Sequence, residues 1–180
     1  IHSAVHEVRH DVVCCWHSHH EDTAAVCMTK VGLLPISQEA VSIYPTIAYH
    51  PFEGTANAMD ERPRIQKNLG KEKMLLLLEN HGPCALGKTI EEAFSLMYSC
   101  SRACTYQQKA MAAVGGDLSK LHMPSKEMVQ QMISRTIRES ERKDKKEYED
   151  GAGAGASAEL VFRAIARKIE DRDGAENIYI

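Results

Sequence analysis

Short apolar runs alternate with helical patterns along the first half of the chain. Three runs are typical of strands: DVVCCW (11–16), TIAYH (46–50) and the apolar centre of KEKMLLLLENHG (71–82). Apolar residues at helical spacing open the chain, and a helix is expected over 21–30, where acidic residues precede an apolar stretch. Because strands and helices alternate, this half predicts a mixed α/β layer.

The second half of the chain is predicted to be mainly helical. Thr89 and Glu92 form a TxxE capping pattern, which begins a long helix that ends near Val114. A second helix starts at Ser125, with apolar residues on one face and a charged run at its end. A third, amphipathic helix spans 158–172, and its apolar face is expected to pack on the body or on another subunit.

Three weaker patterns complete the predicted organisation. LLPIS (33–37) indicates a brief strand, and 60–69 indicates a polar surface helix that stops at Gly70. GAGAGAS (151–157) has the composition of a phosphate-binding loop, but a charged stretch precedes it instead of a strand. We therefore interpret it as a flexible linker.

Composition narrows the class of protein. A chain of 180 residues that is 43% hydrophobic and 26% charged is long enough to fold as one globular domain with a substantial core. The formal net charge of -3 argues against nucleic acid as a partner, because binding to the phosphate backbone requires a basic surface. The longest apolar run, 74–78, is far shorter than the roughly 20 residues of a membrane helix, so no membrane association is expected.

The six cysteines are predicted to be reduced core residues. They form no CxxC pair and lie inside apolar segments, which favours a cytoplasmic protein without disulfides. A regulatory thiol site at Cys14 and Cys15 is the alternative, but no basic residue stands beside them to activate a thiol. The chain also begins without Met and inside a helical pattern, so we expect that an N-terminal part is missing.

Histidines supply the main candidate site. His17 and His19 are separated by one residue, so on an extended strand their side chains leave the same face and can bind one ion. His81 follows the second strong strand in an Asn-His-Gly sequence, where Gly82 allows a sharp turn. The alternative for an HxH pair alone is two surface or core-edge histidines, because the pair lacks the spacing specificity of a full zinc signature.

Other polar residues near these strands have simpler explanations. Glu21 and Asp22 supply favourable negative charge at a helix start. Glu79 is either a solvated strand end or a hydrogen-bonding partner on the same face as the third histidine. His20 and His50 are predicted to be surface or locally hydrogen-bonded residues and not metal ligands.

Together these motifs resemble the class II aldolase and adducin head-domain family over roughly 1–116. The matching stretches are the HxH and NHG strand ends, IHSAVHEVRHDV, GLLPIS, AYH, IQKNLG and GKTIEEAF, of which GLLPIS and IQKNLG look closest to adducins and their uncharacterised microbial relatives. The resemblance implies an α/β fold: a mixed, mainly antiparallel central sheet flanked by helices in three layers, with C-terminal helices. It also implies that His17, His19 and His81 bind Zn²⁺ or another divalent transition metal.

The resemblance further implies a metal-dependent aldehyde-lyase. Such an enzyme cleaves or isomerises a small hydroxy-carbonyl substrate, of sugar-phosphate type, through a metal-stabilised enediolate. The family's catalytic glutamate would lie upstream of Ile1, so no catalytic residue is assigned within the chain. A homo-oligomer, expected to be a tetramer, is implied as well. The alternative is a non-catalytic, adducin-like assembly or interaction module, for which a cytoskeletal partner would be expected.

The patterns divide the chain into four parts. We expect a class II aldolase/adducin-type core over 1–116, a helical extension over 117–143, a flexible linker over 144–157, and a C-terminal helix with its tail over 158–180. No substrate-binding motif lies in these segments, so the sequence does not specify the substrate.

Overall fold

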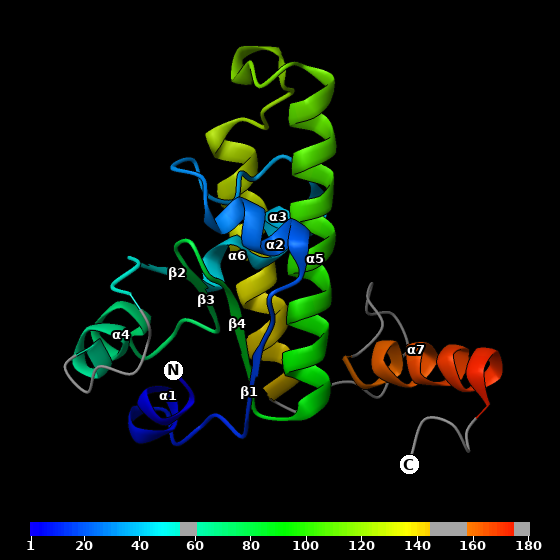
Figure 1. Ribbon diagram of the computed structural model, residues 1–180. Coiled ribbons are helices and arrows are strands. Elements are labelled where there is room, and N and C mark those ends of the chain that lie inside the picture. The colour runs from blue at the N-terminus through cyan, green and yellow to red at the C-terminus, as the bar shows by residue number, and fades with distance from the viewer. Residues whose placement is uncertain (55–60, 145–157, 175–180) are drawn as a thin grey trace.

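Four strands form one mixed sheet at the centre of the computed structural model, which describes residues 1–54, 61–144 and 158–174 (Figure 1). They lie in the spatial order β1-β4-β3-β2. β4 pairs antiparallel with β1 and with β3, whereas β2 pairs parallel with β3. The predicted mixed, mainly antiparallel sheet is therefore confirmed. The strand bounds are β1 (Cys14–His17), β2 (Ile47–His50), β3 (Leu75–Leu78) and β4 (Gly82–Gly87).

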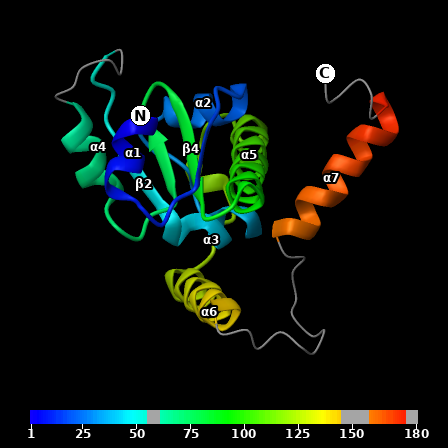
Figure 2. The same cartoon turned by 90° about the horizontal axis from the view of Figure 1, so that it is seen from below.

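Helices cover both faces of this sheet, as Figure 2 shows from below. α1 (His2–Val8) and α4 (Arg62–Leu69) lie on one face. The other face is covered by α2 (Glu21–Cys27), α3 (Gln38–Ile43) and α5 (Ile90–Ala113). The three-layer arrangement expected from the sequence is confirmed.

The run of four leucines in β3 packs into two separate cores. Leu75 and Leu77 face α2, α3 and α5, whereas Leu76 and Leu78 face α1 and α4. Successive side chains of a strand point to opposite faces, so a strand that is covered on both sides reads as a continuous apolar run. All four leucines are buried, which explains why this was the clearest strand in the sequence.

The helix predicted from the capping pattern is α5. The side chain of Thr89 accepts a hydrogen bond from the backbone N–H of Glu92, and the Glu92 carboxylate in turn accepts one from the N–H of Lys88. These two bonds satisfy backbone N–H groups at the helix start that have no partner within the helix. The helix ends at Ala113, close to the predicted end.

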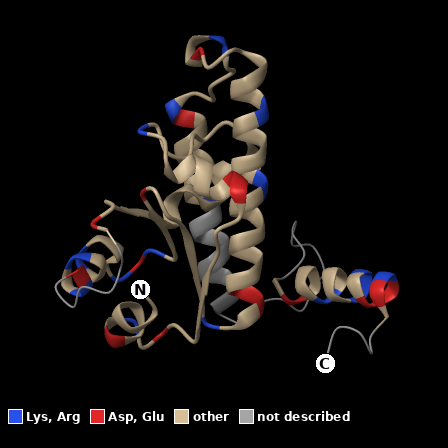
Figure 3. Ribbon diagram, viewed as in Figure 1, with Lys and Arg blue, Asp and Glu red and all other residues tan. Residues whose placement is uncertain are grey.

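The helices beyond α5 are α6 (Lys126–Asp144) and α7 (Ala158–Asp173), and two short 3₁₀ turns occur at η1 (Tyr44–Thr46) and η3 (Leu118–Lys120). Acidic and basic residues occur together on α7, α4 carries basic residues only, and the strands have no charged residue (Figure 3). The predicted linker and tail fall mostly at 145–157 and 175–180, outside the described residues. The division of the chain into four parts stays a prediction. Within the described ranges, no helix has both the length and the apolar composition needed to cross a membrane.

Two predictions about strands are wrong. LLPIS forms no strand, because its backbone N–H groups are taken by side chains: Leu33 donates to the Tyr49 hydroxyl and Leu34 to the Gln107 amide oxygen. Conversely, β4 was not predicted, because Gly82, Pro83 and a further glycine at its end are residues that strands disfavour. Tertiary packing overrides that preference, since every residue of β4 is buried.

Candidate metal centre

Three histidines converge where β1 ends beside the turn between β3 and β4. His17 is the last residue of β1, His19 lies in the loop that follows, and His81 lies in the turn. The Nε2 atom of His17 is 2.9 Å from Nε2 of His19 and 3.1 Å from Nε2 of His81. From the sequence, the side chains of His17 and His19 were expected to project from the same face of one strand. Their side chains do meet, although β1 stops before His19.

The backbone of β4 fixes the orientation of the central imidazole. Nδ1 of His17 is 2.9 Å from the carbonyl oxygen of Pro83. A carbonyl oxygen can only accept a hydrogen bond, so Nδ1 carries the ring proton and donates it. The Nε2 atom, which faces the other two histidines, is therefore left with a free lone pair. This is the arrangement found in metal-ligating histidines, whose second nitrogen donates to a backbone or carboxylate oxygen.

The surroundings of His17 and His81 favour their neutral form. Burial lowers the pKa of His17, and the neighbouring imidazoles of His81, His19 and His2 lower it further, against the opposing effect of the Pro83 carbonyl. Burial likewise lowers the pKa of His81, and His19 acts in the same direction. Only the neutral imidazole offers a lone pair to a metal, so the site favours the binding form.

The turn that presents His81 depends on two neighbouring residues. Asn80 adopts a positive φ of 54°, which Asn tolerates better than most residues. Gly82 has a different role from the one expected: it does not make the sharp turn but permits a close approach. A Cβ atom at Gly82 would lie 2.4 Å from the carbonyl oxygen of Ser18. The absence of a side chain there lets the His17–His19 loop lie directly against the start of β4.

The donor set suits a divalent transition metal. Three imidazole nitrogens around a tetrahedral zinc ion, each at about 2.0 to 2.1 Å, would lie roughly 3.3 Å apart. The distances of 2.9 and 3.1 Å between Nε2 atoms are slightly shorter than that spacing, so a small opening of the cluster would admit such an ion. The three ligand atoms form a candidate ligand group, and three protein ligands would leave coordination positions for a substrate.

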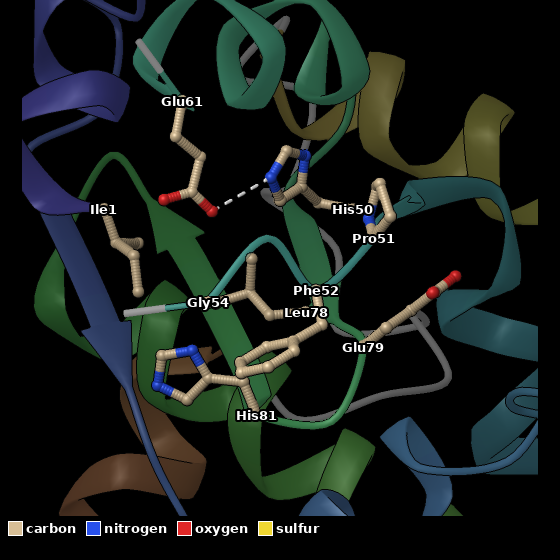
Figure 4. Close-up of a pocket in the computed structure, with 9 residues that line it drawn as sticks. All are labelled: Ile1, His50, Pro51, Phe52, Gly54, Glu61, Leu78, Glu79 and His81. Carbon is tan, nitrogen blue, oxygen red and sulfur yellow. Dashed lines mark hydrogen bonds and ion pairs between the residues drawn. The ribbon is translucent and has the colours of Figure 1, made fainter. Parts of the chain in front are cut away.

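The three acidic residues singled out in the sequence have other places in the structure. Glu21 and Asp22 occupy the first turn of α2, as expected, and the Asp22 carboxylate accepts a hydrogen bond from the hydroxyl of Thr105. Glu79 was expected to share a face with His81 if the strand continued. The strand does not continue, because β3 ends at Leu78, and the exposed Glu79 side chain points away from His81 (Figure 4). Glu79 is therefore the solvated strand end that was the other alternative.

A second polar cluster, which the sequence did not identify, lies beside the histidines. His50, at the end of β2, is only 1% exposed, so its prediction as a surface residue is wrong, whereas its local hydrogen bonding is confirmed. Its Nδ1 atom is 2.9 Å from Nδ2 of Asn68, and its Nε2 atom is 3.3 Å from Oε1 of Glu61. His20, by contrast, is exposed at the start of α2. The signals for the cluster were a strand-end histidine in AYH and polar residues in IQKNLG, but neither pattern reveals burial.

The cysteines agree with the prediction of reduced thiols in most respects. All six are free, and Cys27, Cys84 and two cysteines of α5 are buried. Cys14 and Cys15 are only half-buried, because β1 is an edge strand. Burial raises the pKa of the Cys14 thiol, and raises that of Cys27 to about 12, which opposes thiolate chemistry at both positions.

Comparison with known proteins places this chain in a family. Residues 1–108 match the model of the Class II Aldolase and Adducin N-terminal domain. A Pseudomonas aeruginosa protein named "Putative aldolase class 2 protein" is 35% identical over 175 residues, which cover 96% of this chain and 61% of that protein. Human gamma-adducin is 42% identical over 122 residues, which cover 68% of this chain and 17% of the adducin. The chain thus spans about three fifths of the bacterial relative and much less of the adducin.

Solved structures agree. An aldolase II superfamily protein from Pseudomonas syringae has a TM-score of 0.80 and 31% sequence identity, and the match covers 96% of this chain and 62% of that one. L-fuculose 1-phosphate aldolase from Glaciozyma antarctica has a TM-score of 0.66 at 22% identity over 98% of this chain and 59% of its own, a likeness of fold alone. With the family model covering more than half of its residues, the chain belongs to the class II aldolase and adducin N-terminal domain family.

Proposed function

We propose that this chain is a divalent-metal-binding domain of the class II aldolase type, in which His17, His19 and His81 hold the ion. Zn²⁺ is the ion that we favour, and another divalent transition metal is compatible with three imidazoles. The proposed reaction is the cleavage or isomerisation of a small hydroxy-carbonyl compound, of sugar-phosphate type, by a lyase. A homo-oligomer in the cytoplasm belongs to the same proposal.

The convergence of three Nε2 atoms at 2.9 and 3.1 Å is the observation that supports this function. A bound divalent ion supplies positive charge, which stabilises the negative charge that develops on a substrate oxygen. The chain's own contribution is to aim the three imidazoles at one point and to lower the pKa of His17 and His81 by burial. The Pro83 carbonyl orients His17, and Gly82 lets the two ligand loops pack together.

Metal content tests the proposal. We expect about one divalent ion per chain in protein purified without chelators, measured by plasma mass spectrometry, and its loss in His81→Ala. His20→Ala is the matched control, because it removes an exposed neighbouring histidine outside the cluster and should leave the metal content unchanged. A wild-type protein without metal, or equal loss in both variants, would refute the assignment.

A second function is favoured by the 42% identity to human gamma-adducin, which exceeds the 35% identity to the bacterial class 2 aldolase protein. In that case the domain is a non-catalytic assembly or interaction module. The two functions differ in what a metal-loaded protein does with hydroxy-carbonyl compounds. Turnover that disappears in His81→Ala supports the lyase, whereas a protein that retains its ion and cleaves none of a panel of such compounds supports the module.

A further inference from the structure

A small hollow lies directly beside the three histidines. It is partly open to solvent, and His81 forms part of its wall. Figure 4 shows that His50 and Glu61 approach it from the side opposite His81. Apolar side chains, among them Ile1 and Leu78, line the space between. A molecule bound at the histidines and extending into this hollow would therefore meet the Glu61 carboxylate, whereas the Glu79 carboxylate, which also borders the hollow, points away from His81.

Glu61 is held in place by two further side chains. The Nδ2 amide group of Asn68 donates to Nδ1 of His50, so the ring proton of His50 lies on Nε2 and is donated to Oε1 of Glu61. His50 is 1% exposed and Glu61 6% exposed, so this chain of hydrogen bonds is shielded from water. Burying a carboxylate is costly unless it is hydrogen-bonded, and a hydrogen bond to a charged group is worth more in such an environment.

The same residues are a poor cation site. His50, Glu53 and Glu61 have potential ligand atoms within 4.8 Å of one another. However, Nε2 of His50 carries the proton that it donates to Glu61 and so has no lone pair to offer. Glu53 is bound by Arg64, whose Nε atom lies 2.8 and 2.7 Å from the two carboxylate oxygens. A cation here would have to displace one hydrogen bond and compete with a guanidinium group.

We propose that this hollow binds the hydroxyl-bearing end of the substrate and that the Glu61 carboxylate accepts the hydroxyl hydrogen bond. The proposal rests on the function proposed above, because His81 borders both sites. In a carbon-carbon cleavage the hydroxyl proton passes to Glu61. The O–H electron pair becomes the second bond of the new carbonyl group, and the electrons of the broken C–C bond stay on the other fragment. Glu61 returns the proton in the reverse direction. His50 and Asn68 are positioning residues.

The binding of two hydroxamates tests this role without relying on turnover. Both glycolohydroxamate and acetohydroxamate bind divalent metals, but only the former has an additional hydroxyl group. In zinc-loaded wild-type protein, calorimetry should show roughly tenfold tighter binding of glycolohydroxamate, as expected for a hydrogen bond to a charged group. Glu61→Gln should reduce that preference to nearly none while the affinity for acetohydroxamate stays unchanged. Glu79→Gln, which removes a carboxylate that borders the hollow but points away from His81, should keep the preference.

Other outcomes would overturn the proposal. A hydroxyl preference that survives in Glu61→Gln refutes the role of Glu61, as does equal weakening of both hydroxamates. A second zinc ion per chain that disappears in Glu61→Gln would make the cluster a cation site instead. If neither hydroxamate binds and no metal is present, the proposed function itself has failed. If Glu61→Gln does not fold, Glu61→Asp keeps the charge but withdraws it from the hollow, and an unchanged preference in that variant would also refute the proposal.

Discussion

The carbonyl oxygen of Pro83 decides which nitrogen of His17 faces the other two histidines. This carbonyl oxygen accepts hydrogen bonds from both the His17 ring, at 2.9 Å, and the Ser18 N–H, at 3.2 Å. One backbone atom thus sets the tautomer of a candidate ligand and also anchors the loop that leads to His19. Small changes in the backbone at this point should therefore alter metal affinity.

Gly82→Ala tests how tightly the two ligand loops must approach. The new Cβ atom would meet the backbone oxygen of Ser18 at 2.4 Å, and backbone cannot move aside as a flexible side chain can. We expect the loop between His17 and His19 to shift and zinc affinity to fall roughly tenfold or more, measured by competition with a chromogenic chelator.

Gly70→Ala is the matched control for that experiment. Gly70 has a positive φ of 63°, but a Cβ atom there meets nothing within 4 Å. It should cost about 1 kcal/mol of stability from backbone strain alone and leave zinc affinity unchanged. Wild-type affinity in Gly82→Ala, or an equal loss in both variants, would contradict this account.

At this scale the sequence predicts the convergent histidines better than the residues that support them. His17 and His19 were identified from their HxH spacing at a strand end, and His81 from the Asn-His-Gly turn and the family resemblance. Glu61 and His50 were not, because their importance comes from burial, and burial of a polar residue depends on which elements cover it. The surface alternative for His50 failed for this reason, because Asn68 of α4 lies 2.9 Å from its Nδ1 atom and the ring is buried.

At the scale of elements, one buried arginine connects α1, β1 and β3. Arg9 follows α1 and is 3% exposed. It donates to both carboxylate oxygens of Asp11 at 2.8 Å, to the backbone oxygen of Lys73 at 2.6 Å and to the sulfur of Met74. These bonds hold the segment before β1 against the segment before β3. They therefore fix the position at which β1, the strand that ends at His17, begins.

The pH dependence of stability should reveal this connection. Hydrogen bonding from Arg9 lowers the pKa of Asp11 from its ordinary value to about 2. A carboxyl group whose pKa is lower in the folded protein stabilises it above the unfolded pKa of about 3.9, and this contribution is lost as the pH falls towards the folded value. Because Asp11 is 48% exposed, solvent screening limits the effect, and we expect Asp11→Asn to cost about 1 kcal/mol at neutral pH.

Urea unfolding followed by fluorescence of Trp16, the single tryptophan of the chain, measures that difference. The gap between wild type and Asp11→Asn should shrink as the pH is lowered from neutral to about 3. Asp171→Asn makes the same charge change at an exposed position on α7 and should show no gap of this kind. A gap that is constant over this range, or that widens in acid, would rule out the Arg9–Asp11 pair as its source.

Element prediction succeeded where local signals and packing agree. The capping pattern at Thr89 and the leucines of β3 each point to one structure, and both were confirmed. β4 was missed because its glycine and proline residues argue locally against a strand, while both neighbouring strands require one there. The prediction for 33–37 failed in the opposite direction. Its apolar residues are buried or half-buried without strand pairing, and the side chains of Tyr49 and Gln107 accept hydrogen bonds from the N–H groups of Leu33 and Leu34 instead.

At the scale of the whole molecule, the sheet separates two hydrophobic cores. The three histidines lie at the end of the sheet, where both cores reach it. Strand residues alternate between the cores, so a shift of register would expose both faces at once. α7 stands outside this arrangement. It lies beside α5 (Figures 1 and 2), and the ring of Phe162 meets the ring of Phe94 edge to face at 5.3 Å. Phe94 in turn lies 5.5 Å from the ring of Trp16, next to His17.

This row of aromatic rings predicts that α7 is attached mainly through Phe162. An edge-to-face aromatic pair contributes about 0.5 to 1.5 kcal/mol beyond the apolar area that it buries. Phe162→Ala should therefore release α7 from α5 and lower the hydrogen-exchange protection of α7 amides roughly tenfold, while amides of β3 and β4 keep theirs. Ile169→Ala, 38% exposed on the same helix, is the control and should leave α7 protected. Unchanged protection of α7 in Phe162→Ala would show that other contacts hold the helix. If the amides of β3 and β4 lost as much protection as those of α7, then α7 would be an integral part of the fold. The stability of the core would in that case depend on a helix that lies outside both hydrophobic clusters.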